Sequence, residues 1–305
     1  FLRLVQPWHI VVLAFLLGVT NAFDVPARQS FVLEMVDRED LTNAIALNST
    51  MFNVATATGP ATAGLAYAAF GPAWCFALNG LSFLAVITAL LRMRVRPLVA
   101  PPQRSSPLMD LKAGLRYVVS QPMVVTLIGL VCAFNLFGSS FITLFPAWAV
   151  RVLGGDARTN GLMISARGVG ALLAALTIAS LGRFRGRGRL LSAGTLVFPV
   201  AVLLFALSRW LPASLLILVL VGGALICVMN LANSLVQTLT DDALRGRVMA
   251  IYSLSFLGIL PIGGLLVGSV AQQIGEPPTV ILFALITFAI AGSAWVFVPR
   301  LRSLS

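Results

Sequence analysis

Few residues of this chain could carry out covalent chemistry. His9 is the only histidine, and the three cysteines, Cys75, Cys132 and Cys227, lie far apart and form no CxxC pair. A zinc site needs clustered His and Cys ligands, and a nucleophilic centre needs a Ser or Cys beside a base, so the sequence offers neither. We therefore expect no enzymatic activity, no metal and no other cofactor.

The most unusual charged residue is Arg167, in the middle of the apolar segment ISARGVG at residues 164–170. A cation near the centre of a bilayer costs about 2.5–3.5 kcal/mol on insertion scales, so it is retained where it snorkels or faces a cavity or a partner. We predict that Arg167 faces a cavity and contacts an anionic or polar substrate group. Snorkelling toward the outer surface is the alternative.

The elements that must position Arg167 are membrane-spanning helices. About 20 apolar residues of helix cross a hydrocarbon core of about 30 Å, and membrane helices tolerate interruption by Gly and Pro. Such runs cover residues 8–23, 47–70, 74–91, 123–148, 160–181, 190–207, 212–236, 248–272 and 279–298. The predicted fold is an all-α, polytopic membrane helix bundle with about nine transmembrane helices.

Composition supports the same fold class. The chain is 59% hydrophobic and only 10% charged, with a mean hydropathy of +0.97. These values lie outside the range of ordinary soluble domains. The net charge of +11 would suggest nucleic acid on a soluble face, but no basic face interleaved with aromatic residues exists. We expect a lipid bilayer as partner and no nucleic acid.

The basic residues fall in alternate gaps between the runs and so predict the orientation. One set of gaps holds Arg3, Arg151, Arg158 and Arg209; the other holds Arg28, Arg38, Arg92, Arg94, Arg96, Arg104, Lys112, Arg116, Arg183, Arg185, Arg187, Arg189, Arg245, Arg247, Arg300 and Arg302. Cytoplasmic loops carry the excess of Lys and Arg. The second set and the C-terminus are therefore predicted to be cytoplasmic.

Weak internal similarity indicates a duplicated transporter. Residues 37–64 align with residues 241–268, and both copies start at an acidic loop and enter a Gly- and Pro-rich helix. Between the copies, residues 95–120 form a basic, Pro-rich linker that ends in an amphipathic stretch at 108–119, which could lie along the inner surface. Three runs precede this linker and six follow it. If the halves were once equal, three helices are missing at the front; a genuine nine-helix protein is the alternative.

Several segments resemble a known family. They read NAFDVPARQ at 21–29, DLTNAIALNS at 40–49, GPATAG at 59–64, LNGLSF at 78–83, RVMA at 247–250 and PIGG at 261–264. Together they are similar to the enterobactin-exporter-like branch of the major facilitator superfamily, as helices four to twelve of twelve. The resemblance implies residues 1–94 as the remnant of an N-terminal six-helix half, 95–120 as the cytoplasmic linker and 121–305 as the C-terminal half.

The resemblance also implies a function. It implies secondary active transport by alternating access, with efflux of an amphiphilic small molecule, a siderophore or drug, across the bacterial inner (cell) membrane, by a monomer. Protons are a candidate coupling ion. Ala14 stands where drug antiporters of the superfamily carry an arginine, and the loop at 182–189 lacks their signature acid, so any carrier acid is expected in the helices upstream. Alternatives are a lysophospholipid flippase, an importer of the same fold or a non-transporting fragment.

Further site residues follow from the pattern and the resemblance. Amides at membrane depth hydrogen-bond between helices or line the path, and the cavity candidates beside Arg167 are Asn21, Asn135, Asn230 and Asn233. Asp24 and Arg28 have the i, i+4 spacing of an ion pair and are predicted to latch the cytoplasmic gate, with a conducting role as the alternative. Their counterparts in the other half are Asp241, Asp242, Arg245 and Arg247.

Glycine and proline mark the close helix approaches. We expect packing or kinks at Gly59, Pro60, Gly64, Pro261, Gly263 and Gly264, because a helix without side-chain bulk lets its neighbour approach. The first three also partly match the superfamily's antiporter motif, which leaves a coupling role as the other reading.

Overall fold

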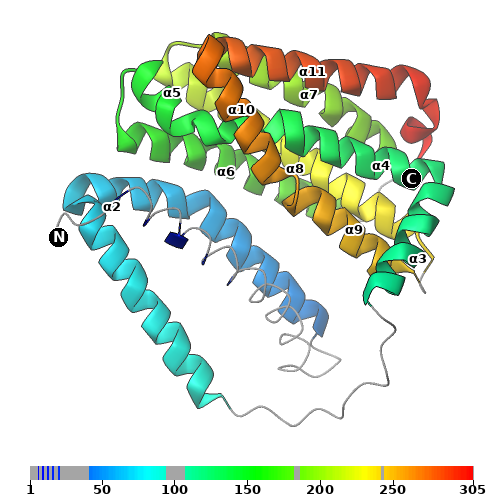
Figure 1. Cartoon of the computed structure of the whole chain (residues 1–305), viewed down its shortest axis with the longest axis horizontal. Helices are drawn as coiled ribbons and strands as arrows, with labels where there is room; N and C mark the ends of the chain where they lie inside the picture. The colour runs from blue at the N-terminus through cyan, green and yellow to red at the C-terminus, as the bar shows by residue number, and fades with distance from the viewer. Residues whose placement is uncertain are drawn as a thin grey trace. The chain divides into compact units, whose positions relative to one another are not determined.

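The structure is a computed structural model that describes residues 41–93, 107–181, 186–241 and 244–304, together with residues 6, 9, 12, 13, 16 and 20. Its regular elements in this part of the chain are all helical (Figure 1). They are α2 (Leu41–Arg92), α3 (Pro107–Ser120), α4 (Pro122–Ala133), the π-helix η1 (Phe134–Ser139), the 3₁₀-helix η2 (Ser140–Leu144), α5 (Phe145–Arg151), α6 (Ala157–Leu181), α7 (Arg187–Leu207), α8 (Leu211–Leu239), α9 (Arg245–Leu257), α10 (Leu260–Ile274), α11 (Glu276–Phe297) and η3 (Pro299–Ser303).

Seven segments of the described residues are long and apolar enough to cross a membrane. They are Ala73–Arg92, Pro122–Arg151, Ala157–Ile178, Arg187–Leu207, Leu211–Leu239, Arg245–Ile274 and Glu276–Phe297. The all-α membrane architecture is thus confirmed, and the seven predicted runs from 74–91 onward match these segments. The run at 47–70 is helical within α2, and the run at 8–23 lies largely outside the described residues.

The chain divides into two compact units. The N-terminal unit contains residues 1–55 and 69–101, and the C-terminal unit contains residues 56–68 and 102–305. The division near residue 101 falls inside the predicted linker. In the N-terminal unit, α2 leaves helical geometry at Gly71, where φ is 77°. Glycine adopts positive φ without the steric cost that a Cβ would bring.

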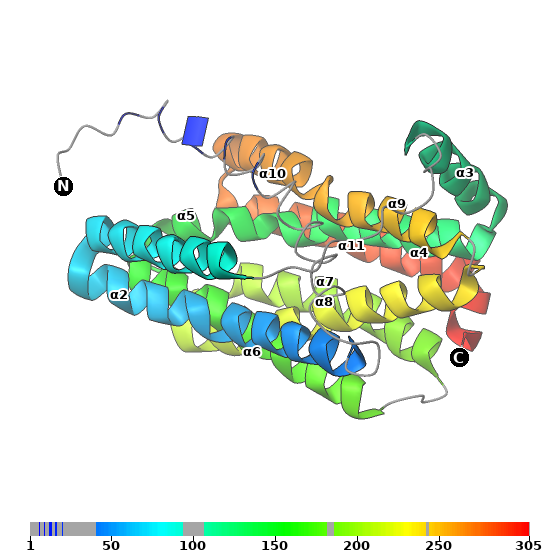
Figure 2. The same ribbon diagram turned by 90° about the horizontal axis from the view of Figure 1, so that it is seen from below.

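The C-terminal unit is a bundle centred on α8. Helices α6 and α7 pack against α8, and α11 packs against α7 (Figures 1 and 2). Helix α10 crosses η1, η2 and α11, while α3 packs against α9. Helix α3 contains the predicted amphipathic stretch; its Gly114 and Val118 are buried, whereas Leu111, Leu115 and Val119 are exposed.

An aromatic cluster packs between α5, η2 and α7. Trp148 stacks on Phe205 with ring centroids 4.8 Å apart, and Phe141 and Phe145 each lie within 6 Å of Phe205, at 5.8 and 5.9 Å. All four side chains are buried. Aromatic pairs contribute about 0.5–1.5 kcal/mol beyond the area that they bury, so the cluster joins α5 and η2 firmly to α7.

The predicted run 123–148 is not one regular helix. It passes from α4 into η1 and η2 before α5 begins with Pro146 in its first turn. Side chains at the transition bond to carbonyls four residues back: Asn135 Nδ2 donates to Val131 O at 2.9 Å and Ser140 Oγ donates to Leu136 O at 2.7 Å. Pro146 has no N–H to continue the ladder. A π-bulge of this kind often marks a functional site.

Candidate functional site

Arg167 lies near the midpoint of α6 and is half-buried. Its Nε is buried without a hydrogen-bond partner, and so is the Oγ of Ser165, two residues earlier. Among the described residues no carboxylate or carbonyl accepts a bond from the guanidinium. A buried donor without a partner costs free energy, and a ligand with an acceptor group would satisfy it.

Glycines fix where Arg167 stands, because they let α6 and α8 touch backbone to backbone. A methyl group on Gly222 would overlap the carbonyl oxygen of Arg167, and a methyl group on Gly170 would overlap the carbonyl oxygen of Val219. This small-residue crossing is a common device in membranes, where close van der Waals contact replaces the hydrophobic effect. These glycines were not among the predicted packing residues, although the pair Gly222-Gly223 inside an apolar run was a usable signal.

A polar network links η1, α8 and α9. Asn135 is 3% exposed, and its Nδ2, besides bonding Val131 O, lies 3.9 Å from Met229 Sδ. The hydroxyl of Tyr252 donates to Met229 O at 3.0 Å. The amide of Asn135 therefore makes its hydrogen bonds inside the bundle.

The two predicted amides of α8, Asn230 and Asn233, are less buried than Asn135. Asn230 is exposed, whereas Asn233 is half-buried and accepts a bond from Gln237 Nε2 at 2.5 Å. Asn230, Asn233 and Gln237 follow one another at spacings of three and four residues, which places them along one stripe of α8. A polar stripe on a helix of this hydropathy suits a surface that meets water or a polar ligand.

The gate candidates that the structure describes surround the turn between α8 and α9. The N–H of Asp241 donates to the hydroxyl of Tyr117 in α3 at 3.2 Å, and Arg245 Nε donates to Gln237 O at 3.2 Å. At Gly114 of α3 a Cβ would lie 3.1 Å from Arg247 Cβ. The contacts of Asp241 and Arg247 join the linker helix α3 to this turn, and that of Arg245 joins α9 to α8. Asn21, Asp24, Arg28 and Asp242 lie outside the described residues.

Two of the predicted packing glycines hold α10 against the irregular helix. A Cβ on Gly263 would lie 2.7 Å from Leu136 O, and one on Gly264 would lie 3.2 Å from Thr143 Cγ2. Pro261 lies in the first turn of α10, after the break that separates α10 from α9. Gly59, Pro60 and Gly64 lie in a stretch of α2 that is helical, and the structure does not describe their surroundings.

The opposite end of the bundle holds polar contacts that the sequence analysis did not predict. Arg151 Nη1 lies 2.8 Å from Glu276 Oε1 and joins α5 to α11. Because the Arg151 side chain is 72% exposed, the pair contributes about 0–1 kcal/mol. At the start of α6, the N–H of Thr159 donates to Asp156 Oδ1 at 3.1 Å, and this bond lowers the pKa of the Asp156 carboxyl.

The described residues that could act as metal ligands or nucleophiles lie apart from one another. Within the described ranges no three His, Cys, Asp or Glu side chains come close enough to hold a metal ion, and Cys75, Cys132 and Cys227 are free and half-buried. What the geometry provides is an unpaired cation and a stripe of amides at membrane depth in a helix bundle. A helix bundle with these polar groups at membrane depth is typical of a polytopic membrane transporter.

Comparison with known proteins gives the family. The sequence profile of the transmembrane secretion effector family matches residues 1–304. The chain therefore belongs to this family of major facilitator superfamily transporters, which confirms the resemblance, and it is a multi-span protein of the cell membrane.

Relatives and solved structures agree with this assignment. The chain is 28% identical to the multidrug efflux pump Tap of Mycolicibacterium fortuitum, over 97% of this chain and 74% of Tap. It is 23% identical to the staphyloferrin A transporter of Staphylococcus aureus, over 92% and 70%, and 27% identical to the enterobactin exporter EntS of Escherichia coli, over 85% and 62%. A bacterial homolog of the human lysosomal transporter Spinster shares the fold, with a TM-score of 0.62 at 15% identity, over 91% of this chain and 74% of the homolog.

Proposed function

We propose that this transporter exports an amphiphilic small molecule, a siderophore or drug, by alternating access, and that Arg167 contacts an anionic or polar group of that molecule. The observation that carries the proposal is the unpaired, buried Nε of Arg167 at the middle of α6. Efflux pumps and siderophore transporters among the relatives supply the substrate class. The amides of Asn230 and Asn233 are proposed to line the same path, whereas Asn135, which was predicted to do so, is buried and bonded to Val131 O within the bundle.

The test removes the charge and then restores it. The full-length protein is expressed in cells that lack their own exporters, and efflux of a drug panel and of siderophore is measured at matched membrane abundance. Arg167→Ala should reduce efflux by at least about tenfold, since a charge-assisted bond contributes about 1.5–3 kcal/mol. Arg167→Lys should restore part of it, because lysine keeps the charge but loses the planar fork.

Arg158→Ala is the matched control, because it removes an exposed arginine from the start of the same helix. It should leave efflux unchanged. Equal efflux by wild type and Arg167→Ala would assign Arg167 to snorkelling and refute its contact with substrate.

The proposed orientation places the C-terminus in the cytoplasm. The contacts of the C-terminal unit support a common end for the predicted cytoplasmic segments: Arg187 Nη1 bonds Ser234 Oγ at 3.4 Å, and the N–H of Gly188 bonds Leu304 O at 3.0 Å. Figure 1 shows the C-terminus, α3 and the start of α9 at this end, with α5 at the other. Positive residues thus gather where the positive-inside rule expects the cytoplasm.

Labelling of introduced cysteines tests the orientation. In a background without Cys75, Cys132 and Cys227, the variants Arg104→Cys and Arg187→Cys should react only from the cytoplasmic side and Asp156→Cys only from outside. Reaction of Arg187→Cys with an impermeant reagent in intact cells would reverse the orientation.

A further inference from the structure

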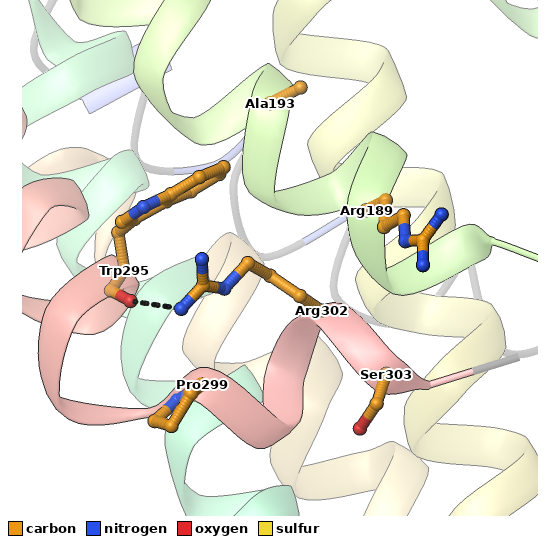
Figure 3. A pocket seen from close by; sticks show the side chains of 6 residues that line it. All are labelled: Arg189, Ala193, Trp295, Pro299, Arg302 and Ser303. Carbon is orange, nitrogen blue, oxygen red and sulfur yellow. Dashed lines mark hydrogen bonds between the residues drawn. The ribbon is translucent and has the colours of Figure 1, made fainter.

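A pocket lies between the start of α7, the end of α11 and η3, away from Arg167. It has a volume of about 610 Å³ and is lined by Arg189, Ala193, Trp295, Pro299, Arg302 and Ser303 (Figure 3). These residues come from segments about a hundred positions apart in sequence. The lining contains two arginines and no acidic side chain, so its charge favours an anion.

The guanidinium of Arg302 is held in place for such a ligand. Its carbon lies 4.6 Å from the centroid of the Trp295 ring, and Nη2 donates to Trp295 O at 3.3 Å. A guanidinium carries five N–H donors, and this bond uses one of them. A stacked arginine is pre-organised, so less rotamer entropy is lost when the remaining donors bind a phosphate or carboxylate.

Neighbouring side chains indicate where the ligand comes from. Val296 and Phe297, at the end of α11 beside the pocket, are 65% and 80% exposed. Both α7 and α11 are long and apolar enough to span the membrane, and tryptophan is enriched at the level of lipid headgroups. A ligand with a phosphate for the arginines and acyl chains for the exposed apolar residues fits both features.

We propose that this pocket binds the headgroup of an anionic phospholipid from the cytoplasmic leaflet. The leaflet rests on the proposed orientation, but the site does not depend on substrate export. Arg302 contacts the phosphate, Arg189 adds positive charge at the edge of the pocket (Figure 3), and Trp295 lies at the level of the headgroup while the acyl chains cover Val296 and Phe297. Because the N–H of Gly188 bonds Leu304 O at 3.0 Å, a lipid bound here also stabilises the docking of η3 on the start of α7.

The test measures lipid binding to the purified full-length protein in neutral detergent. Phosphatidylglycerol and phosphatidylcholine are titrated separately, and binding is followed by native mass spectrometry and by the shift in thermal unfolding. Phosphatidylglycerol should bind and raise the unfolding temperature, and phosphatidylcholine should bind more weakly. Arg302→Gln should weaken phosphatidylglycerol binding by about tenfold, the effect of losing one charge-assisted hydrogen bond, and Arg189→Gln should weaken it by less.

Two further variants separate the pocket from general charge. Ala193→Phe fills the pocket without changing charge and should weaken binding as much as Arg302→Gln does, which keeps the test valid if Arg302→Gln folds poorly. Arg300→Gln is the matched control, because Arg300 lies in η3 at the same end but does not line the pocket. It should leave binding within about twofold, since a rim charge outside a site contributes little.

Three results would overturn the proposal. Equal binding of both lipids would remove the need for an anionic headgroup. Equal losses from Arg300→Gln and Arg302→Gln would reduce the site to bulk surface charge. Inorganic phosphate that displaces phosphatidylglycerol at millimolar concentration, with no loss from Ala193→Phe, would make it a site for free anions.

Discussion

Each end of the C-terminal bundle has an arginine over a tryptophan, and the two pairs are built differently. At one end Arg209 lies 5.9 Å from the centroid of Trp148, which is 1% exposed and stacked on Phe205. Arg209 Nη1 is also bonded to Ala206 O at 2.8 Å. At the other end Arg302 lies 4.6 Å from Trp295, which is half-buried and lines a pocket.

The difference separates a structural contact from a binding site. Trp148 is enclosed by protein, and its arginine closes the aromatic cluster from outside. Trp295 and Arg302 keep an open face and leave donors unused. The same type of residue pair therefore stabilises the bundle at the predicted outer end and forms part of a proposed ligand site at the predicted cytoplasmic end. The burial of the tryptophan determines which role the pair has.

The largest expected effect tests this separation directly. Trp148→Ala should destabilise the protein by about 3–5 kcal/mol, the usual cost of a large cavity in a packed core. Trp295→Ala should cost only about 1 kcal/mol, since it removes a cation–π contact at a partly exposed site. Thermal or SDS unfolding of the purified protein measures both.

Trp148→Phe is the control for the buried ring. It keeps most of the ring and removes the indole N–H, whose nitrogen is buried without a partner, so its cost should be small. Equal losses from Trp148→Ala and Trp295→Ala would show that the two ends are packed alike.

A smaller effect concerns the helix crossing between the two ends. Gly222→Ala places a methyl group on the carbonyl oxygen of Arg167 and should cost about 1–3 kcal/mol, as overpacking does. Gly292→Ala in α11 is the matched control, because nothing lies within 4 Å of its Cβ position. Alanine should stabilise that helix by up to about 1 kcal/mol. A neutral Gly222→Ala would mean that α6 and α8 can separate freely.

The positions of the helices could be predicted from the sequence, but the irregular segment within one of them could not. Apolar runs of bilayer length located the seven spans because length and hydropathy are local properties. The irregular segment at η1 and η2 was not predicted, because it depends on Asn135 and Ser140 bonding back to carbonyls and on Pro146 ending the ladder. Each of these is tolerated in regular membrane helices elsewhere, so the pattern alone does not predict a π-helix.

The candidate site shows the same division. The position of Arg167 within a membrane-spanning helix was predictable from the apolar run around it, whereas its contact with substrate stays a prediction. Its contact with Gly222 was not predictable, since the two lie in different helices and only packing brings them together. The pocket at Arg302 needed the same long-range information: Arg189 and Arg302 appeared in the sequence only as members of the cytoplasmic cation set. Local composition located the charges, and tertiary structure decided which of them form sites.

The smallest expected effect lies at the end that holds Trp148, in the exposed turn before α6. The N–H of Thr159 donates to Asp156 Oδ1, so the folded pKa of this carboxyl lies below its ordinary value of 3.8. A group whose folded pKa is depressed contributes stability above its unfolded pKa and loses it as pH falls through the folded pKa. The contribution of the Asp156 carboxylate to stability should therefore be complete at neutral pH and vanish only below pH ~4.

Carboxyl ¹³C NMR of aspartate-labelled protein measures the titration of Asp156, with Asp156→Asn to assign the signal. Thr159→Ala should retain most of the depression, because it removes the hydroxyl and keeps the backbone N–H that is the main cause. An Asp156 pKa at or above 3.8 would show that the hydrogen bond from the Thr159 N–H is not formed in solution.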